Sequence, residues 1–178
     1  MKMYRCRICG ETYLGSEVPS HCPFCGAHSE HIVDTTEYPE DINTVDITEI
    51  ERNDLIRAID LELGNTRFYL AMGKSKDDHR LASAYKRLAK VEAEHCELFC
   101  KLAGVEEPAD LMTPGEAADD WCANIDESVK REQRATKFYT EAAARATNPR
   151  IHEVFAAISA VEADHIELDG VAGELANC

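Results

Sequence analysis

The chain repeats part of its sequence after 70 residues, and this repeat restricts the possible folds more than any other feature. ELGNTRFY (62–69) aligns with EQRATKFY (132–139), and VEAEHCEL (91–98) aligns with VEADHIEL (161–168). Each copy therefore contains a Glu followed 30 residues later by a Glu-x-x-His motif. Since the segments also have helical periodicity, the repeat predicts a mainly α fold: two similar hairpins packed around a pseudo-twofold axis as a four-helix bundle.

Each predicted helix carries a stripe of side chains at steps of three and four residues, which should face the core. In every stripe the apolar residues are interrupted by Glu, or by Glu and His. The stripes are Leu55, Ile59, Glu62, Thr66 and Tyr69; Leu81, Tyr85, Leu88, Glu92, His95 and Phe99; Ile125, Val129, Glu132, Thr136 and Tyr139; and Ile151, Phe155, Ile158, Glu162 and His165.

Four carboxylates on the axis of a bundle need compensation, because burying even one unpaired carboxylate costs several kcal/mol. No Lys or Arg occupies the stripes. Two divalent cations would balance the charge, and the i,i+3 spacing of Glu-x-x-His puts both side chains on one helix face. Protonated carboxyl groups, or a stripe that faces solvent, are the alternatives. We predict a dinuclear site made of Glu62, Glu92, His95, Glu132, Glu162 and His165.

Capping signals mark where the predicted helices begin. Thr48 and Glu51 form a T-x-x-E capping box, and Asn148-Pro149 opens the fourth helix. A second box at 113–116 (TPGE), with Pro in the first helical position, predicts the start of the third helix there. The remaining link, about 104–113, could just cross the bundle at roughly 3.3 Å per residue. An exchange of helices between two chains would relieve that stretch.

A second metal site is predicted near the N-terminus. The pattern C-x2-C-x12-C-x2-C can surround one tetrahedral zinc or iron ion with four thiolates, and Gly10 and Gly26 can take the positive φ that such knuckles need. About 35 residues cannot fold on an apolar core alone, so the metal should also stabilise this part. The predicted ligands are Cys6, Cys9, Cys22 and Cys25. We therefore divide the chain into a metal-binding domain (1–36), a polar linker (37–47) and the bundle (48–178).

The other cysteines and histidines carry weaker signals. We expect Cys96 and Cys100 to be small buried residues, with redox chemistry as the alternative. Cys122, Cys178 and Trp121 give no functional indication. We expect His21, His28 and His31 to lie on the surface rather than to bind metal.

Charge and hydropathy exclude several classes of partner. The formal net charge of −15 argues against binding to nucleic acid or anionic membranes. No apolar run is long enough for a transmembrane helix, and MKMYRCRICG lacks the apolar core of a signal peptide. We therefore expect a cytoplasmic protein.

The N-terminal segment resembles a short rubredoxin domain. The resemblance rests on Tyr4, the Cys-x-x-Cys-Gly knuckle, Tyr13, Gly15, Pro19 and the Cys-Pro-x-Cys-Gly-Ala knuckle. It implies one iron ion that transfers single electrons, although a zinc ribbon would have nearly the same ligands.

The bundle ligands resemble the diiron site of ferritin-like proteins, and a rubredoxin-like domain before such a bundle is similar to the reverse-order rubrerythrins. The resemblance implies that Glu92 and Glu162 bridge two irons, Glu62 and Glu132 are terminal ligands, and His95 and His165 bind one iron each. It also implies that Tyr69 and Tyr139 hydrogen-bond to ligand carboxylates; packing alone is the alternative. The family's additional Glu is replaced by Ala135, whose repeat mate is Asn65. The site should therefore have six ligands instead of seven.

The resemblance implies a non-haem diiron peroxidase that reduces hydrogen peroxide to water in oxidative stress defence, with electrons passing through the rubredoxin-like iron. No G-x-G-x-x-G motif follows a predicted strand. An external donor, a rubredoxin or an NAD(P)H-dependent reductase, is therefore expected. The family also implies a homodimer with each small domain facing the other subunit's diiron site, although the linker could hold it against its own bundle. A ferritin-like iron oxidation or storage protein, an O2-reducing oxidase and a zinc-ribbon docking scaffold are the alternatives.

Overall fold

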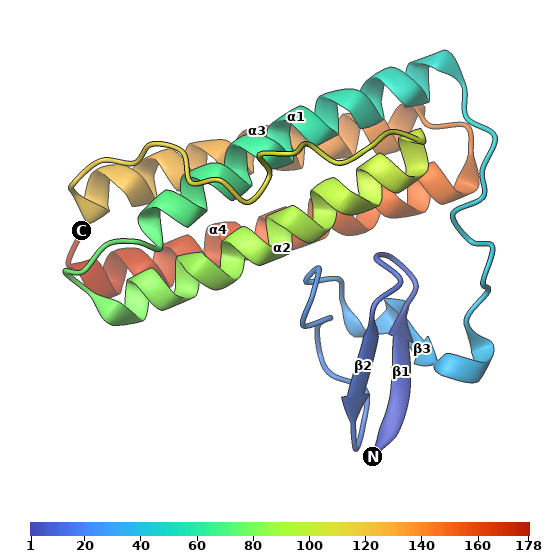
Figure 1. Ribbon diagram of the computed structural model, residues 1–178, viewed down its shortest axis with the longest axis horizontal. Coiled ribbons are helices and arrows are strands. Elements are labelled where there is room, and N and C mark those ends of the chain that lie inside the picture. The colour runs from blue at the N-terminus through green and yellow to red at the C-terminus, as the bar shows by residue number, and fades with distance from the viewer.

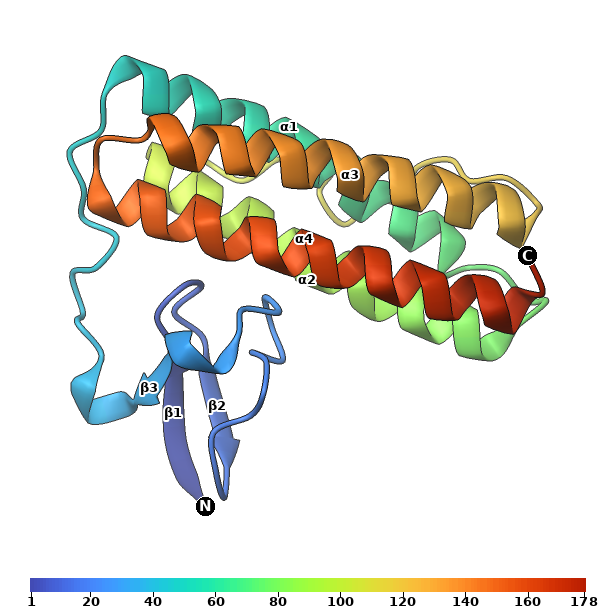
Figure 2. The same ribbon diagram turned by 180° about the vertical axis from the view of Figure 1, so that it is seen from behind.

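The predicted repeat folds into two antiparallel hairpins. In the computed structural model, which describes residues 1–178, the helices are α1 (Glu49–Met72), α2 (His79–Ala103), α3 (Trp121–Arg145) and α4 (Pro149–Ala176). Helix α1 packs mainly on α2, and α3 packs mainly on α4. The two hairpins lie side by side as a four-helix bundle (Figures 1 and 2). The predicted fold class is confirmed.

Two of the predicted helix starts are correct in detail. The hydroxyl of Thr48 accepts from the backbone N–H of Glu51, whose carboxylate accepts from the N–H of Thr48, so the capping box is complete. The side chain of Asn148 accepts from the first N–H groups of α4, and Pro149 occupies the first turn. These local signals position the ends of the helices that carry the predicted ligands.

The prediction for the start of the third helix is wrong. Helix α3 begins at Trp121 and is capped by the Asp120 carboxylate, which accepts from the N–H of Ala123. Residues 113–116 instead pass close to α1, where the N–H of Gly115 donates to the carbonyl of Arg67 at 2.8 Å. The segment packs so closely on α1 that a Cβ on Gly115 would lie 3.3 Å from Arg67, and it runs on without forming a helix until Trp121.

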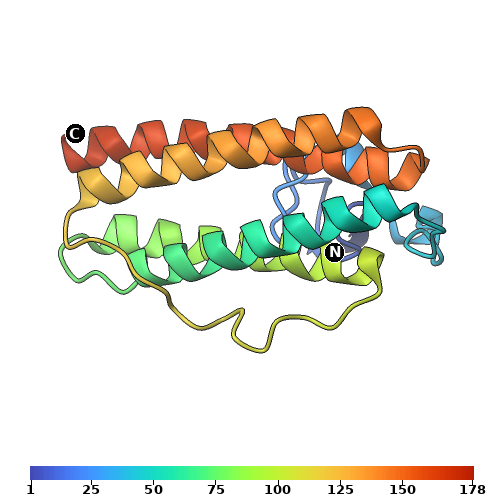
Figure 3. The same cartoon turned by 90° about the horizontal axis from the view of Figure 1, so that it is seen from above.

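The link between α2 and α3 is consequently longer than the sequence suggested. It extends from Gly104 to Asp120 and runs along the outside of the bundle (Figure 3). An ion pair between Arg67 and Asp110 and the buried side chain of Leu111 hold it against the helices. The stretch that would have favoured an exchange of helices between two chains is therefore absent.

The N-terminal residues form a small antiparallel sheet with strand order β2-β1-β3. The strands are β1 (Lys2–Cys6), β2 (Thr12–Gly15) and β3 (Ile32–Asp34), and short 3-10 helices occupy Ser29–His31 and Thr35–Glu37. An irregular segment connects this small domain to α1. The domain lies beside α2 and α4 of its own bundle (Figures 1 and 2), and its buried residues join the same apolar cluster as the bundle core.

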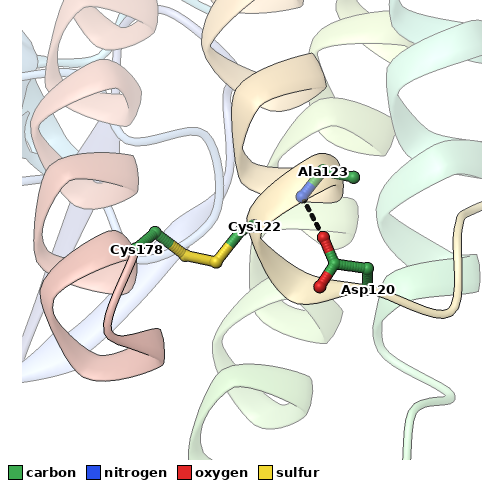
Figure 4. Close-up of a disulfide and its surroundings, with 4 residues drawn as sticks. All are labelled: Asp120, Cys122, Ala123 and Cys178. Carbon is green, nitrogen blue, oxygen red and sulfur yellow. Dashed lines mark hydrogen bonds between the residues drawn. A yellow bond between two sulfur atoms is a disulfide. The ribbon is translucent and has the colours of Figure 1, made fainter.

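A disulfide between Cys122 and Cys178 is a feature that the sequence did not indicate. It joins the first turn of α3 to the C-terminal residue, next to the Asp120 cap (Figure 4). The two cysteines are 56 residues apart, so only the folded hairpin brings them together. Cys96 and Cys100 are buried free thiols, as expected.

The four helices do not meet the requirements of a membrane-spanning helix. None of them combines the length and the apolar character that crossing a bilayer requires.

Candidate metal centres

The four N-terminal cysteines converge on one point from two knuckles. Their sulfur atoms all lie within 4.8 Å of one another, with Cys6–Cys25 at 3.7 Å and Cys9–Cys22 at 3.8 Å. Four sulfur atoms about 2.3 Å from a tetrahedral ion would be roughly 3.8 Å apart, so the spacing fits a single metal ion. Gly10 and Gly26 have the predicted positive φ, at 91° and 75°. This arrangement fits a rubredoxin-like metal site.

The six predicted ligands of the bundle meet in its centre, and every helix contributes. Glu62, Glu92, His95 and Glu162 form one group, and Glu92, Glu132, Glu162 and His165 form a second, each with ligand atoms within 4.8 Å of one another. All six are buried, and the most exposed, His165, retains only 7% of its surface. Glu92 and Glu162 belong to both groups. The geometry therefore suits two ions that share these two carboxylates.

The two groups have nearly the same internal geometry. The Nδ1 atom of His95 lies 3.3 Å from Glu92, 3.3 Å from Glu162 and 3.6 Å from Glu62. The Nδ1 atom of His165 lies 3.1 Å from Glu92 and 3.1 Å from Glu162, and 3.8 Å from Glu132. The pseudo-twofold axis predicted from the repeat therefore passes between the two groups.

Several polar atoms of this centre have no hydrogen-bond partner in the protein. The unpaired buried atoms include Glu62 Oε2, both oxygens of Glu92, Glu132 Oε2, Glu162 Oε1 and His95 Nδ1. Burial, together with the carboxylates of Glu162 and Glu92, holds the pKa values of Glu62 and Glu132 well above the ordinary range. Two divalent cations would satisfy these atoms and neutralise four carboxylates. The donor set thus fits the dinuclear metal site, and the ligand assignment stays a prediction.

Two buried tyrosines hold the unshared carboxylates, and they do so across the hairpins. Tyr139 of α3 donates its hydroxyl to Glu62 of α1 at 2.5 Å, and Tyr69 of α1 donates to Glu132 of α3. Burial and the neighbouring carboxylates raise the pKa of both phenols well above the ordinary value, so the phenols remain donors. Such contacts fix the orientation of a ligand carboxylate.

A hydrogen bond connects the two candidate centres. The Nε2 atom of His95 lies 2.8 Å from the carbonyl oxygen of Cys25. A carbonyl can only accept, so Nε2 carries a proton and Nδ1 is the ring nitrogen that faces the carboxylates. The knuckle approaches α4 so closely that a Cβ on Gly26 would lie 2.7 Å from Val161. The sequence did not reveal this docking, because nothing in a linker specifies which surface the domain contacts.

The position of the family's additional Glu has no ligand atom. Ala135 is completely buried, and its repeat mate Asn65 is buried with its Oδ1 atom 3.5 Å from the guanidinium of Arg131. The sequence also did not single out Asp169, a buried carboxyl group that accepts from Tyr85.

Comparisons with known proteins agree with this arrangement. Residues 4–33 match the family described as "Rubrerythrin, rubredoxin-like domain". The chain is 31% identical over 123 residues to reverse rubrerythrin-1 of Clostridium acetobutylicum, and the alignment covers 64% of this chain and 68% of that protein. No solved structure matches significantly. With its rubredoxin-like domain placed before the bundle, the chain belongs to the reverse rubrerythrin family of iron-binding oxidoreductases.

Proposed function

We propose that the protein reduces hydrogen peroxide to water at a diiron site in the bundle, with electrons supplied through iron in the four-cysteine site. Two ferrous ions in the bundle would supply one electron each, so that H2O2, two electrons and two protons give two molecules of water. Glu92 and Glu162 would bridge the ions, Glu62 and Glu132 would be terminal ligands, and His95 and His165 would bind one ion each.

The hydrogen bond from His95 to Cys25 is the observation that carries this proposal. It joins a ligand of one centre to a ligand of the other at 2.8 Å, within one chain. A storage protein that takes iron as its substrate would need no such connection. A zinc ribbon would gain nothing from it either, because zinc has no redox chemistry. Electron transfer along this contact needs no second subunit, although a homodimer remains part of the proposal.

The residues around the bundle site would restrict its chemistry. Tyr69 and Tyr139 hold Glu132 and Glu62 in place by hydrogen bonds from α1 and α3. The rings of Phe99, Tyr139 and Phe155 pack on one another and are completely buried, and Phe99 lies one helical turn after His95 on α2. An external donor, a rubredoxin or an NAD(P)H-dependent reductase, would then reduce the iron of the small domain.

Anaerobic stopped-flow spectroscopy tests the proposal. Iron-loaded, fully reduced protein is mixed with hydrogen peroxide and, separately, with O2. We expect peroxide to oxidise the diiron site faster than O2 does, followed by oxidation of the thiolate-bound iron. A faster reaction with O2 would favour an oxidase, and the absence of an iron chromophore in the four-cysteine site would favour the zinc-ribbon scaffold.

Two glycine variants test whether the docking contact carries the electrons. Gly26→Ala and Gly10→Ala place the same side chain at a positive φ in equivalent knuckles. Only the former meets α4, at Val161, whereas the latter meets the hydroxyl of Tyr38 within the small domain and linker. We expect slower oxidation of the thiolate-bound iron in Gly26→Ala than in Gly10→Ala. Equal oxidation rates in the two variants would mean that electrons do not pass through the docking contact.

A further inference from the structure

Three side chains with metal-binding chemistry meet outside both candidate centres. His21 and His28 come from the small domain, and Asp164 comes from α4 of the bundle. One nitrogen of each imidazole and one carboxylate oxygen lie within 4.8 Å of one another. The sequence led us to expect surface histidines here, because it could not show that Asp164 lies opposite them.

The ligand atoms are directed at one point. The Nε2 atom of His28 lies 2.6 Å from Asp164 Oδ2, and the Nε2 atom of His21 lies 3.6 Å from the same oxygen. Ligands about 2.0–2.1 Å from a tetrahedral ion would be roughly 3.3 Å apart, a value between these two distances. Small rotations of partly exposed side chains would therefore admit an ion.

The opposite edge of each ring already has a polar neighbour. The Nδ1 atom of His21 hydrogen-bonds to the hydroxyl of Ser20 at 3.1 Å, and the Nδ1 atom of His28 lies 4.0 Å from Glu30. A hydrogen bond such as the one to Ser20 orients a metal-binding imidazole and leaves the other nitrogen free to bind. Both Nε2 atoms consequently face Asp164.

The backbone also holds the two histidines together. His21 and His28 form an antiparallel β-bridge across the second cysteine knuckle, and their rings meet edge to face with centroids 4.8 Å apart. The N–H of Cys22 donates to the carbonyl of Ala27 at 2.7 Å just inside that bridge. The four-cysteine site would therefore pre-organise two of the three ligands.

We propose that His21, His28 and Asp164 form a third metal site, which binds a divalent cation of the zinc class and joins the small domain to its own bundle. Two imidazoles and one carboxylate favour Zn²⁺ over Mg²⁺ or Ca²⁺, which prefer oxygen ligands. The three side chains are partly exposed, so a bound ion could complete its shell with water. Since Asp164 precedes His165 on α4, such an ion would hold the knuckle where Cys25 meets His95.

The simpler explanation is that His28 and Asp164 form a hydrogen bond that docks the small domain on the bundle, without binding a metal ion. The variant His21→Ala separates the two explanations, because it removes one proposed ligand and leaves the 2.6 Å contact of His28 intact. His79→Ala is the matched control: it removes an exposed histidine at the start of α2, far from the small domain.

Zinc titration of the iron-loaded protein, prepared without a polyhistidine tag, tests the site. Isothermal titration calorimetry should detect one additional Zn²⁺ per chain, while the absorbance of the thiolate-bound iron shows that this iron is not displaced. We expect His21→Ala to weaken binding at least roughly tenfold and His79→Ala to bind like the wild type. Unchanged binding in His21→Ala, or no additional Zn²⁺ in the wild type, would overturn the proposal.

Crystals soaked in Zn²⁺ provide an independent readout. Anomalous scattering at the zinc edge should place the ion between the Nε2 atoms of both histidines and Oδ2 of Asp164. An ion found elsewhere on the surface would also overturn the assignment. Neither readout depends on peroxide turnover, so this site and the proposed function can fail separately.

Discussion

The two hairpins supply matching predicted metal ligands, but the side chains around these ligands differ. The 70-residue shift aligns Tyr85 with Phe155 and Phe99 with Asp169. In one half the hydroxyl of Tyr85 donates to the carboxyl of Asp169 at 2.7 Å, and in the other the rings of Phe99 and Phe155 pack with centroids 5.4 Å apart. The pair Tyr85–Asp169 is thus polar and buried, and the pair that occupies the aligned positions, Phe155–Phe99, is aromatic.

The tyrosines that hold the carboxylates show the same asymmetry. Tyr69 has a second partner, the hydroxyl of Ser128 at 3.0 Å, whereas the residue aligned with Ser128 is Ala58. The apolar half also contains the cluster that includes the four cysteines. The repeat therefore preserves the predicted ligands and varies the layer of side chains around them, and the more apolar side belongs to the same cluster as the small domain.

The largest expected effect tests whether the halves are equivalent in binding metal. Replacing a shared carboxylate, as in Glu162→Gln, should reduce the iron in the bundle from two ions to fewer than one, because both groups lose a ligand. Replacing an unshared carboxylate, Glu62→Gln or Glu132→Gln, should leave about one ion. Metal analysis normalised to the thiolate-bound iron measures the difference.

Glu97→Gln is the control for this series, since Glu97 lies on α2 outside both groups. Two ions retained in Glu162→Gln would show that this carboxylate is not shared. A difference between Glu62→Gln and Glu132→Gln would show instead that the surrounding layer makes the two positions unequal.

The disulfide is the next largest difference between the hairpins. It closes the second hairpin, while the aligned positions of the first are Arg52 and Pro108. Since a loop of this length loses much of its freedom in the unfolded chain, removing the bond should cost about 4 kcal/mol of unfolding free energy. Urea unfolding with and without a reductant measures this cost. In the double variant Cys122→Ser/Cys178→Ser, the reductant should not change the free energy of unfolding. A loss of similar size in this variant would show that the reductant acts through the other cysteines.

Features that depend on local sequence were predicted correctly more often than features that depend on tertiary packing. Most stripe residues and the six side chains that meet in the bundle were found from periodicity, and two helix starts were found from capping signals. Two stripe residues of α3, Val129 and Thr136, are only half-buried, and Ser128 and Ala135 are buried on that helix instead. The start of α3 was misplaced because the TPGE segment has local helix-start chemistry, whereas in the structure this segment packs along α1 and the helix begins only at Trp121.

Contacts that join distant segments could not be predicted from the sequence. The crossing of Tyr69 and Tyr139 to the opposite hairpin, the disulfide and the contact of Asp164 with His28 each link residues at least 56 positions apart. A disulfide also does not agree with our expectation of a cytoplasmic protein, because thiols are normally reduced in the cytoplasm. Such pairings depend on how elements pack, which local patterns do not encode.

The polar pair beside His165 should contribute less than the disulfide. Tyr85→Phe leaves the carboxyl of Asp169 buried without its hydrogen bond, which should cost about 1–3 kcal/mol of unfolding free energy. Urea unfolding of the single and double variants measures the coupling. In an Asp169→Ala background the same change should cost at least about 1 kcal/mol less, because no carboxyl group remains to lose its partner. If Tyr85→Phe cost the same unfolding free energy in both backgrounds, the hydroxyl group of Tyr85 would not stabilise the carboxyl group of Asp169.

The smallest expected effect concerns Glu51, which ties the start of the first hairpin to the turn of the second. Its carboxylate accepts from the N–H groups of Thr147 at 2.8 Å and Asn148 at 2.7 Å as well as from Thr48. The residue aligned with it is Trp121, which stacks on Tyr85 instead. Burial raises the pKa of Glu51, but these hydrogen bonds outweigh burial and lower the pKa to about 2.

A lowered pKa in the folded state stabilises the protein above the pKa of the unfolded chain, here about 4.5. The contribution of Glu51 should therefore be complete near neutral pH and disappear as the pH falls from about 4.5 through about 2. Glu51→Gln should cost roughly 1.5 kcal/mol near neutral pH. Acid also releases bound metal, so the informative quantity is the difference between the two proteins in urea unfolding at each pH, in which shared losses cancel. That difference should shrink as the pH falls; a constant difference would mean that Glu51 joins the hairpins by its shape and not by its charge.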